Sequence, residues 1–133
     1  MKNYAIKEHH LYNKAFAKGA RVVGKLTAVY VLRDYAARRL MLANPEKKYF
    51  NRVGLSVGKK IGGAVVRSRA RRLMREAYRQ IEDEGNLLHG NLVVIAARAK
   101  IAEAQMQDVK KDLFKCLSRV GLIEKPKAKD DIQ

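Results

Sequence analysis

The amino-acid sequence predicts a small α+β domain in which helices pack on one β-sheet. Three observations support this fold class. The chain has 133 residues, of which 47% are apolar, and this suits a single domain with a packed core. Stretches with helical periodicity alternate along the chain with short stretches rich in β-branched residues. The last of these short stretches, residues 91–97 (NLVVIAA), is a continuous apolar run typical of a strand buried on both faces.

The first predicted helix covers residues 8–18. Its periodicity places four side chains on one face, namely Leu11, Tyr12, Ala15 and Phe16. Gly19 follows directly and is suited to end the helix. The next stretch, residues 26–32 (LTAVYVL), is rich in β-branched and aromatic residues and is therefore expected to form a strand.

The segment between this strand and the next is ambiguous. Residues 33–49 contain YAARRLMLA, which could form a short helix before Asn44-Pro45 breaks it, but an extended hairpin arm is the alternative. Residues 52–58 are expected to form a second strand. Gly54, Ser56 and Gly58 occupy one side of that strand, which leaves the face open to close approach by another group.

The C-terminal half is expected to hold a long helix, a strand and a second helix. The long helix follows Gly62-Gly63 and runs to about residue 84, where Gly85-Asn86 stops it. After the strand at residues 91–97, an amphipathic helix is predicted over residues 102–120, and Cys116 lies on its apolar stripe as a core residue. We expect one domain over residues 1–121 and a charged tail over residues 122–133.

The charge of the chain is strongly unbalanced, with 29 Lys and Arg against 13 Asp and Glu, a net charge of +16. Binding to nucleic acid is the favoured explanation, and a solvated basic surface or an anionic membrane are the alternatives. No apolar run approaches the ~18 residues of a membrane span, and the N-terminus lacks the apolar core of a secretory signal. The single cysteine cannot form an internal disulfide, which fits a cytoplasmic protein. No Cys/His cluster has zinc-ligand spacing.

The long helix is predicted to have two functional sides. A helical wheel groups its apolar residues on one arc, and the adjacent arc carries a row of arginines at i, i+4 spacing: Arg67, Arg71, Arg75 and Arg79. Like charges at this spacing destabilise a helix by about 0.2–0.5 kcal/mol per pair. Phosphate groups would relieve the repulsion through bidentate contacts. Arg69 lies at the opposite edge of the apolar arc, and the preceding turn adds Lys59 and Lys60.

A second candidate surface is aromatic. Tyr12 and Phe16 are one turn apart on the first helix, and Tyr30 lies on a strand that could face them. The three rings could form a stacking platform for unpaired bases. Aromatic residues at helical spacing are also common in cores, and that alternative stays open. The sequence shows no catalytic motif: no paired carboxylates, no GxxxxGK[ST] and no HExxH.

Residues 52–78, RVGLSVGKKIGGAVVRSRARRLMREAY, resemble the protein subunit of bacterial ribonuclease P. The match to that family's pattern RVGxSVxKKxGxAVxRNRxxRxxRE runs through RVGLSV, KKIG, AV and RRLMRE. LYNKAFAKGARV and VVIAAR are similar to the family's first helix and last strand, so the resemblance covers most of residues 9–120. It implies a two-layer sandwich around a small mixed sheet, similar to domain 2 of ribosomal protein S5. It also implies a left-handed βαβ crossover, which is rare among proteins in general.

The resemblance also implies a function. The protein would bind the ribonuclease P RNA, which carries the active site and its Mg²⁺ ions, and would assist removal of the 5′ leader from precursor tRNA. No residue of this chain would be catalytic or bind metal, and the free protein would be a monomer or weak dimer. The residues implied for RNA-subunit binding are Lys59, Lys60, Arg67, Ser68, Arg69, Arg71, Arg72 and Arg75. The residues implied for leader binding are Tyr12, Phe16 and Tyr30. A ribosomal protein of the same fold and a DNA-binding architectural protein are the competing hypotheses.

The chain departs from the family pattern at three places. Ser68 stands where the family has Asn, and its shorter side chain makes a specific amide contact to RNA doubtful there. Gly63 replaces the usual Asn before the long helix, so a weaker N-cap is expected, by a few tenths of a kcal/mol. Residues 33–49 form a longer connection than usual and carry Arg38, Arg39, Lys47 and Lys48, which suggests an RNA or dimer contact.

Overall fold

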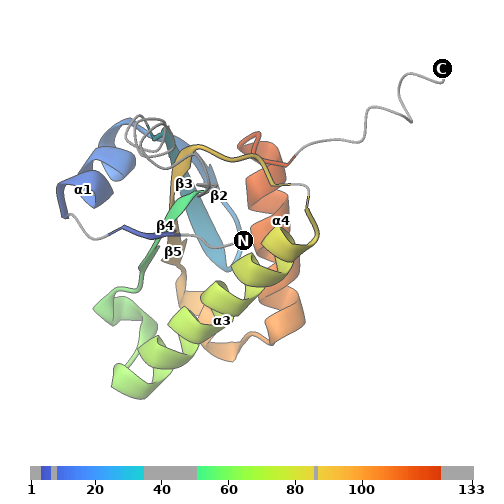
Figure 1. Ribbon diagram of the computed structural model, residues 1–133. Helices are drawn as coiled ribbons and strands as arrows, with labels where there is room; N and C mark the ends of the chain where they lie inside the picture. The colour runs from blue at the N-terminus through green and yellow to red at the C-terminus, as the bar shows by residue number, and fades with distance from the viewer. Residues whose placement is uncertain (1–3, 7–8, 35–50, 86, 124–133) are drawn as a thin grey trace.

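The computed structural model describes residues 4–6, 9–34, 51–85 and 87–123. Its strands form one mixed sheet of five strands in the order β1-β4-β5-β3-β2 (Figure 1). The strands are β1 (Tyr4–Ala5), β2 (Ala20–Val23), β3 (Thr27–Arg33), β4 (Arg52–Ser56) and β5 (Asn91–Ala97). β4 is parallel to both of its neighbours, β1 and β5, whereas β3 is antiparallel to both β5 and β2.

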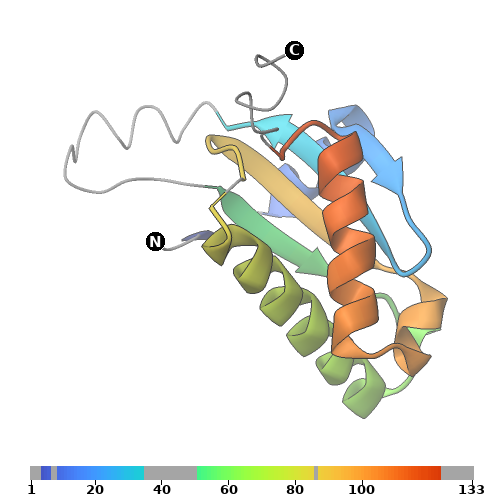
Figure 2. The same ribbon diagram turned by 90° about the vertical axis from the view of Figure 1, so that its right-hand side faces the viewer.

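Helices cover the two faces of the sheet unequally. The short helix α1 (His9–Lys18) packs on one face, and the longer helices α3 (Ala64–Asp83) and α4 (Met106–Arg119) pack on the other (Figures 1 and 2). Two 3₁₀ turns precede the long helices, η1 (Lys59–Ile61) before α3 and η2 (Ala99–Glu103) before α4. α1 has only 10 residues, against 20 in α3 and 14 in α4.

The unit β4-α3-β5 confirms the predicted crossover. β4 and β5 are parallel neighbours joined through α3. Viewed from the side of α3 with both strands pointing upward, β5 lies to the left of β4, which is the left-handed sense (Figure 2). This arrangement breaks the right-handed preference of nearly all βαβ units. It brings the arginine-rich α3 alongside α4 on the same face.

The core has two parts, one on each face of the sheet. The larger cluster lies between the sheet and α3 and α4, and includes Val29, Val93 and Ile95. The smaller one lies under α1 and includes Leu92 and Val94. Successive β5 residues therefore belong to opposite cores, as period-2 alternation requires. This confirms the prediction that residues 91–97 form a strand buried on both faces.

The structure corrects three predicted boundaries. The last helix begins at Met106 rather than Ala102, because Ala99–Glu103 forms a 3₁₀ turn and Gln105 starts the helix with a capping box to Asp108. The strand predicted over residues 52–58 ends at Ser56, before η1. The tail predicted over residues 122–133 starts too early, since the buried Leu122 and the bridge from Ile123 to Leu87 belong to the folded domain.

Two strands of the sheet have no counterpart in the sequence prediction. β1 has only two residues, and β2 has four, of which only Val22 is not exposed. Such short edge strands carry too few residues to show a period-2 pattern. The ambiguous segment 33–49, apart from its first two residues, lies outside the described residues, as does the charged segment that follows Ile123.

Candidate nucleic-acid interface

The rotation of α3 about its axis is fixed by its apolar side. Ala70, Met74 and Ala77 are buried against the sheet and α4, as the helical wheel predicts. Tyr78 is buried too, and its hydroxyl accepts a hydrogen bond of 3.0 Å from Nδ2 of Asn51. Burial raises the pKa of the Tyr78 phenol. With this side held in the core, the arginines of α3 are turned toward solvent and toward the two edges of the helix.

An open groove of about 540 Å³ runs along the outer side of α3. Small side chains and arginines line it together: Ala64, Val65, Ser68, Arg69, Arg72 and Arg75. Val65 is 84% exposed at the start of this groove. Four of the residues implied for RNA-subunit binding therefore meet in one concave, positively charged surface.

Arg69 differs from the other arginines because it also bonds within the protein. Its two Nη atoms donate hydrogen bonds to the carbonyl oxygens of Ala102 (3.2 Å) and Ala104 (2.7 Å). These bonds connect α3 to η2 and the residue after it. A guanidinium carries five N–H donors, so three remain for other partners. Arg69 is thus held at the edge of the groove by these hydrogen bonds, and its positive charge is still available there to a ligand.

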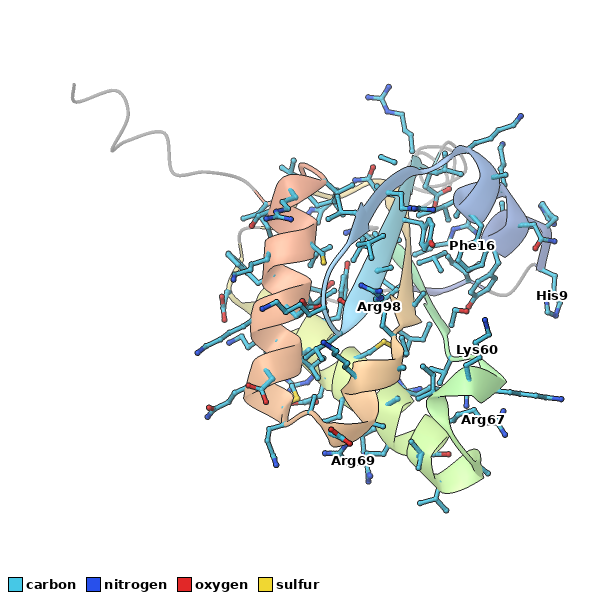
Figure 3. The ribbon with its side chains drawn as sticks, turned by 180° about the vertical axis from the view of Figure 1, so that it is seen from behind. His9, Phe16, Lys60, Arg67, Arg69 and Arg98 are labelled. Atoms are coloured by element: carbon cyan, nitrogen blue, oxygen red, sulfur yellow. The ribbon has the colours of Figure 1, made fainter. Side chains whose placement is uncertain are left out.

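The other edge of α3 carries Arg67 and Arg71. Figure 3 shows Arg67 close to Lys60 of η1 and well separated from Arg69. Arg67 is partly buried, and its Nε has no hydrogen-bond partner among the residues that the structure describes. Lys59 and Lys60 are exposed. The predicted RNA-binding residues are therefore divided between two edges of α3 rather than gathered on one.

Arg79 is neutralised within α3. It forms ion pairs with Glu76 and, at 3.0 Å, with Oδ2 of Asp83. The hydrogen bond from Arg79 lowers the pKa of the Glu76 carboxyl. No such pair forms at Arg71, Arg72 or Arg75 within the described ranges. Uncompensated charge is thus concentrated in the N-terminal two thirds of the helix.

The three predicted aromatic residues come together on the face under α1. The rings of Phe16 and Tyr30 meet edge-to-face with centroids 4.8 Å apart and planes at 81°. Tyr12 lies directly over β4, since a Cβ atom added to Gly54 would come within 2.5 Å of its hydroxyl oxygen. Phe16 is 40% exposed, and the two tyrosines are partly buried. The rings therefore pack against each other and against the sheet, while part of their surface remains accessible to solvent.

Two arginines that sequence reasoning did not select border this aromatic face. Arg21 on β2 is the register partner of Tyr30. Arg98 follows β5 in extended conformation, so period-2 alternation puts it on the same face as Val94. The period-2 alternation of residues 91–98 in the sequence could have shown that Arg98 lies on this face of the sheet. Arg21 required β2, which the sequence did not predict.

The β2–β3 turn lies beside Arg98 and is hydrogen-bonded both to α4 and to the Arg98 side chain. Asp112 of α4 accepts hydrogen bonds from the backbone N–H groups of Lys25 (2.9 Å), Leu26 (3.1 Å) and Thr27 (2.9 Å), and from the Thr27 hydroxyl (2.8 Å). The guanidinium of Arg98 donates to the carbonyl oxygen of Gly24. One carboxylate therefore satisfies three backbone donors that the tight turn would otherwise leave unpaired.

The described part of the chain contains no group of three or more His, Cys, Asp or Glu side chains that could hold a metal ion. Cys116 is 1% exposed, and burial raises the pKa of its thiol, which confirms it as a core residue. None of the helices in these ranges is long and apolar enough to cross a membrane.

Comparisons with known proteins agree with the fold. The family model described as Ribonuclease P matches residues 1–121. The ribonuclease P protein component of Geobacillus kaustophilus is 34% identical over 124 residues, which cover 93% of this chain and 92% of the relative. That of Bacillus cereus (strain 03BB102) is 36% identical over 121 residues, covering 91% and 94%.

Solved structures show the same fold at lower identity. The RNase P protein of Staphylococcus aureus superposes with a TM-score of 0.70 at 24% identity and covers 92% of this chain and 100% of its own. The RNase P protein of Thermotoga maritima gives a TM-score of 0.66 at 20% identity, with coverages of 90% and 97%.

Proposed function

Since this chain belongs to the ribonuclease P protein family, the protein component of a tRNA-processing endoribonuclease, we propose that it binds two RNAs on two surfaces. The α3 surface binds the RNA subunit, and the aromatic face binds the 5′ leader of precursor tRNA. The observation that carries this proposal is the separation of the two surfaces on opposite sides of one sheet. A single chain can then hold the RNA subunit and the substrate at the same time.

The α3 groove supports the RNA-subunit assignment through its charge and shape. Arg72 and Arg75 line it without a carboxylate partner among the described residues. Arginine binds phosphate through two parallel hydrogen bonds, which suits a rigid helix facing a folded RNA backbone. Ser68 lies in the same groove, where its hydroxyl can donate to or accept from RNA. Lys59, Lys60, Arg67 and Arg71 extend the surface around the other edge of α3.

The aromatic face supports the leader assignment. Phe16 of α1 and Tyr30 of β3 pack against each other edge-to-face, and Phe16 is exposed while Tyr30 is partly buried. Stacking of an unpaired base on such a ring contributes about 1–3 kcal/mol and tolerates different bases. A leader is single-stranded, whereas mature tRNA ends in a paired stem, so this face favours substrate over product.

The catalytic chemistry is assigned to the RNA subunit, together with the Mg²⁺ ions that it binds. This assignment is supported by the membership of the chain in the ribonuclease P protein family. The protein then contributes affinity and position rather than a nucleophile. We propose a cytoplasmic protein that is a monomer or weak dimer when free, as sedimentation of the purified chain would test.

Cleavage of precursor tRNA tests the proposal as a whole. The purified chain is added to its cognate RNA and to precursor tRNA at low Mg²⁺, where the RNA alone cleaves poorly. Cleavage at the mature 5′ end should increase, because the protein adds affinity for the substrate. An RNA-binding protein without a role in processing would bind RNA and leave the cleavage rate unchanged.

A matched pair of phenylalanines tests the aromatic face. Phe16→Ala should weaken binding of leader-bearing substrate by about 1–3 kcal/mol and leave binding of mature tRNA unchanged. Phe114 on α4 has a similar exposure, 37% against 40%, but lies on the other side of the sheet. Phe114→Ala should therefore affect neither RNA. An equal loss for both RNAs in Phe16→Ala would exclude a leader-specific role.

A further inference from the structure

The outer side of α4 carries a second row of cations, which the sequence analysis did not select. Lys111, Lys115 and Arg119 follow one another at i, i+4 spacing, and all three are exposed. They lie on the side of the helix opposite the buried Val109 and Leu113. The row extends over about 12 Å of the helix at the usual rise per residue. Like charges at this spacing repel each other. We call these three cations the α4 row.

The acidic side chains nearest to the α4 row have other partners. Asp112 faces the β2–β3 turn, where it accepts four hydrogen bonds. Asp108 closes the capping box at the start of the helix, where its Oδ2 accepts the backbone N–H of Gln105 at 3.1 Å. Glu84 at the end of α3 pairs with Lys110 at 2.6 Å. None of the ion pairs within the described ranges involves the α4 row, so its charge is available to an external anion.

The α4 row lies in the same layer of the molecule as the arginine groove of α3. The two helices pack side by side on one face of the sheet and begin at the same end of the molecule (Figure 2). The bonds from Arg69 to Ala102 and Ala104 connect them near their starts, and the Lys110–Glu84 pair connects them further along. An RNA that lies in the α3 groove can therefore continue over α4 without crossing the sheet.

The surroundings of the α4 row favour RNA over a membrane or a second copy of the chain. A helix that binds a membrane surface inserts an apolar face, but the apolar stripe of α4, with Val109, Leu113 and Leu117, is buried in the core. Phe114 is 37% exposed, and one scattered apolar side chain is ordinary on a protein surface. A second copy would bring a net charge of +16 toward a basic row.

We propose that the α4 row binds phosphates of the same RNA subunit that the α3 groove binds, so that the two helices form one continuous interface. The inference rests on the proposed binding of the RNA subunit to α3 and extends it to a helix outside the arginine motif. Lysine binds phosphate as a point charge with three rotatable donors, whereas arginine binds it in a fixed geometry. The α4 row therefore adds affinity, and the α3 arginines fix the position of the RNA.

Binding of the RNA subunit by the double variant Lys111→Gln/Lys115→Gln, measured over a salt series, tests the inference. The log–log salt slope should fall by about 1.4–1.8, because each phosphate contact contributes about 0.7–0.9. Kd should rise about tenfold or more at low salt, and the difference from the wild type should shrink as the salt concentration increases. Urea unfolding of the free protein should show no loss of stability, since both side chains are exposed and Gln and Lys have similar helix propensity.

Two controls separate the α4 row from charge in general and from apolar contact. Lys14→Gln/Lys18→Gln removes the same charge from two exposed positions on α1, on the other side of the sheet, and should keep the salt slope. Phe114→Ala changes the exposed surface of α4 without removing charge and should keep it as well.

Three results would overturn the inference. The first is an unchanged slope in Lys111→Gln/Lys115→Gln, and the second is an equal fall in the α1 double variant. The third is a loss of binding to vesicles of anionic phospholipid while affinity for the RNA subunit is kept, which would assign the row to a membrane surface. Arg72→Ala distinguishes this failure from that of the proposed function. If Arg72→Ala weakens RNA-subunit binding and the α4 variant does not, only the inference fails; if neither does, the assignment of the RNA subunit to α3 fails.

Discussion

Arg69 on α3 and Ala104, two residues before α4, are joined by a hydrogen bond of 2.7 Å from the guanidinium to the carbonyl oxygen. A second bond from the same guanidinium reaches Ala102. An arginine in the middle of an RNA-binding motif therefore also connects two elements of the fold. Its substitution should have consequences that substitution of its neighbours lacks.

Arg69→Ala and Arg72→Ala are expected to separate stability from RNA binding. Both line the groove, so both should weaken binding to the RNA subunit and reduce the log–log salt slope by about 0.7–0.9 for each phosphate that is no longer bound. Only Arg69→Ala should also lower the free energy of unfolding, by about 1–2 kcal/mol, because it removes two hydrogen bonds to carbonyl oxygens. Urea unfolding of the free protein and binding across a salt series measure the two effects. Equal stability of the two variants would contradict a structural role for Arg69.

Gly54→Ala is expected to disturb the aromatic face without touching α3. The added methyl group would overlap the ring of Tyr12 and push it away from the sheet. Binding of leader-bearing substrate should weaken by about 1 kcal/mol, near the lower end of a stacking contribution, while RNA-subunit binding stays the same. Gly58→Ala is the control, since a Cβ atom there meets nothing within 4 Å. An undisturbed leader affinity in Gly54→Ala would argue against a role for Tyr12.

Asp112→Asn is expected to destabilise the fold. The carboxylate accepts four hydrogen bonds from residues of the β2–β3 turn, and the amide can neither accept all of them nor supply the negative charge. A loss of about 1.5–3 kcal/mol in unfolding free energy follows from the usual value of a charge-assisted bond. Asp83→Asn, at an exposed position near the end of α3, should cost far less. Chemical unfolding of the two variants checks the difference.

Tyr78→Phe is expected to change how stability depends on pH. Burial raises the pKa of Tyr78 in the folded state above its unfolded value, so the fold disfavours the phenolate. The stability contributed by the neutral phenol is complete below the unfolded pKa of about 10 and is lost as the pH rises above it. Tyr78→Phe should lose about 1 kcal/mol near neutral pH, with its bond from Asn51.

The same variant should then lose less stability than the wild type on the alkaline side. Unfolding free energies measured at about pH 8 and about pH 11, on either side of the ordinary tyrosine pKa, provide the comparison. Parallel pH curves for the two proteins would show that Tyr78 ionises as freely in the fold as in the unfolded chain.

Much of the fold could be predicted because its signals are local. The α3 periodicity, the stop at Gly85 (φ +83°) and the apolar run of β5 are each contained in a few turns or one strand. The errors lie where local signals are weak or ambiguous. β1 and β2 are too short to show a pattern. The predicted start of α4 is wrong because Ala99–Glu103 continues helical composition through a 3₁₀ turn.

The candidate site divides in the same way. The positions of Arg67 and Arg69 on opposite edges of α3 follow from 3.6-residue periodicity alone, and the helical wheel predicts them. The bonds from Arg69 to Ala102 and Ala104 span more than 30 residues of sequence and could not be anticipated from any local pattern. The same holds for Arg21 beside Tyr30, which depends on the register of two strands.

The sequence by itself determined the helix that carries the arginines, the side of that helix that is buried, and the family to which the chain belongs. All of these are encoded in residue type at fixed spacing along one segment. The tertiary structure alone decided that Phe16 meets Tyr30 and that Arg69 is held by η2. It also decided that Arg79 is neutralised while Arg72 has no carboxylate partner in the described part of the chain. Which charges remain available for RNA depends on contacts between residues whose proximity is set by packing, and packing is a property of the whole chain.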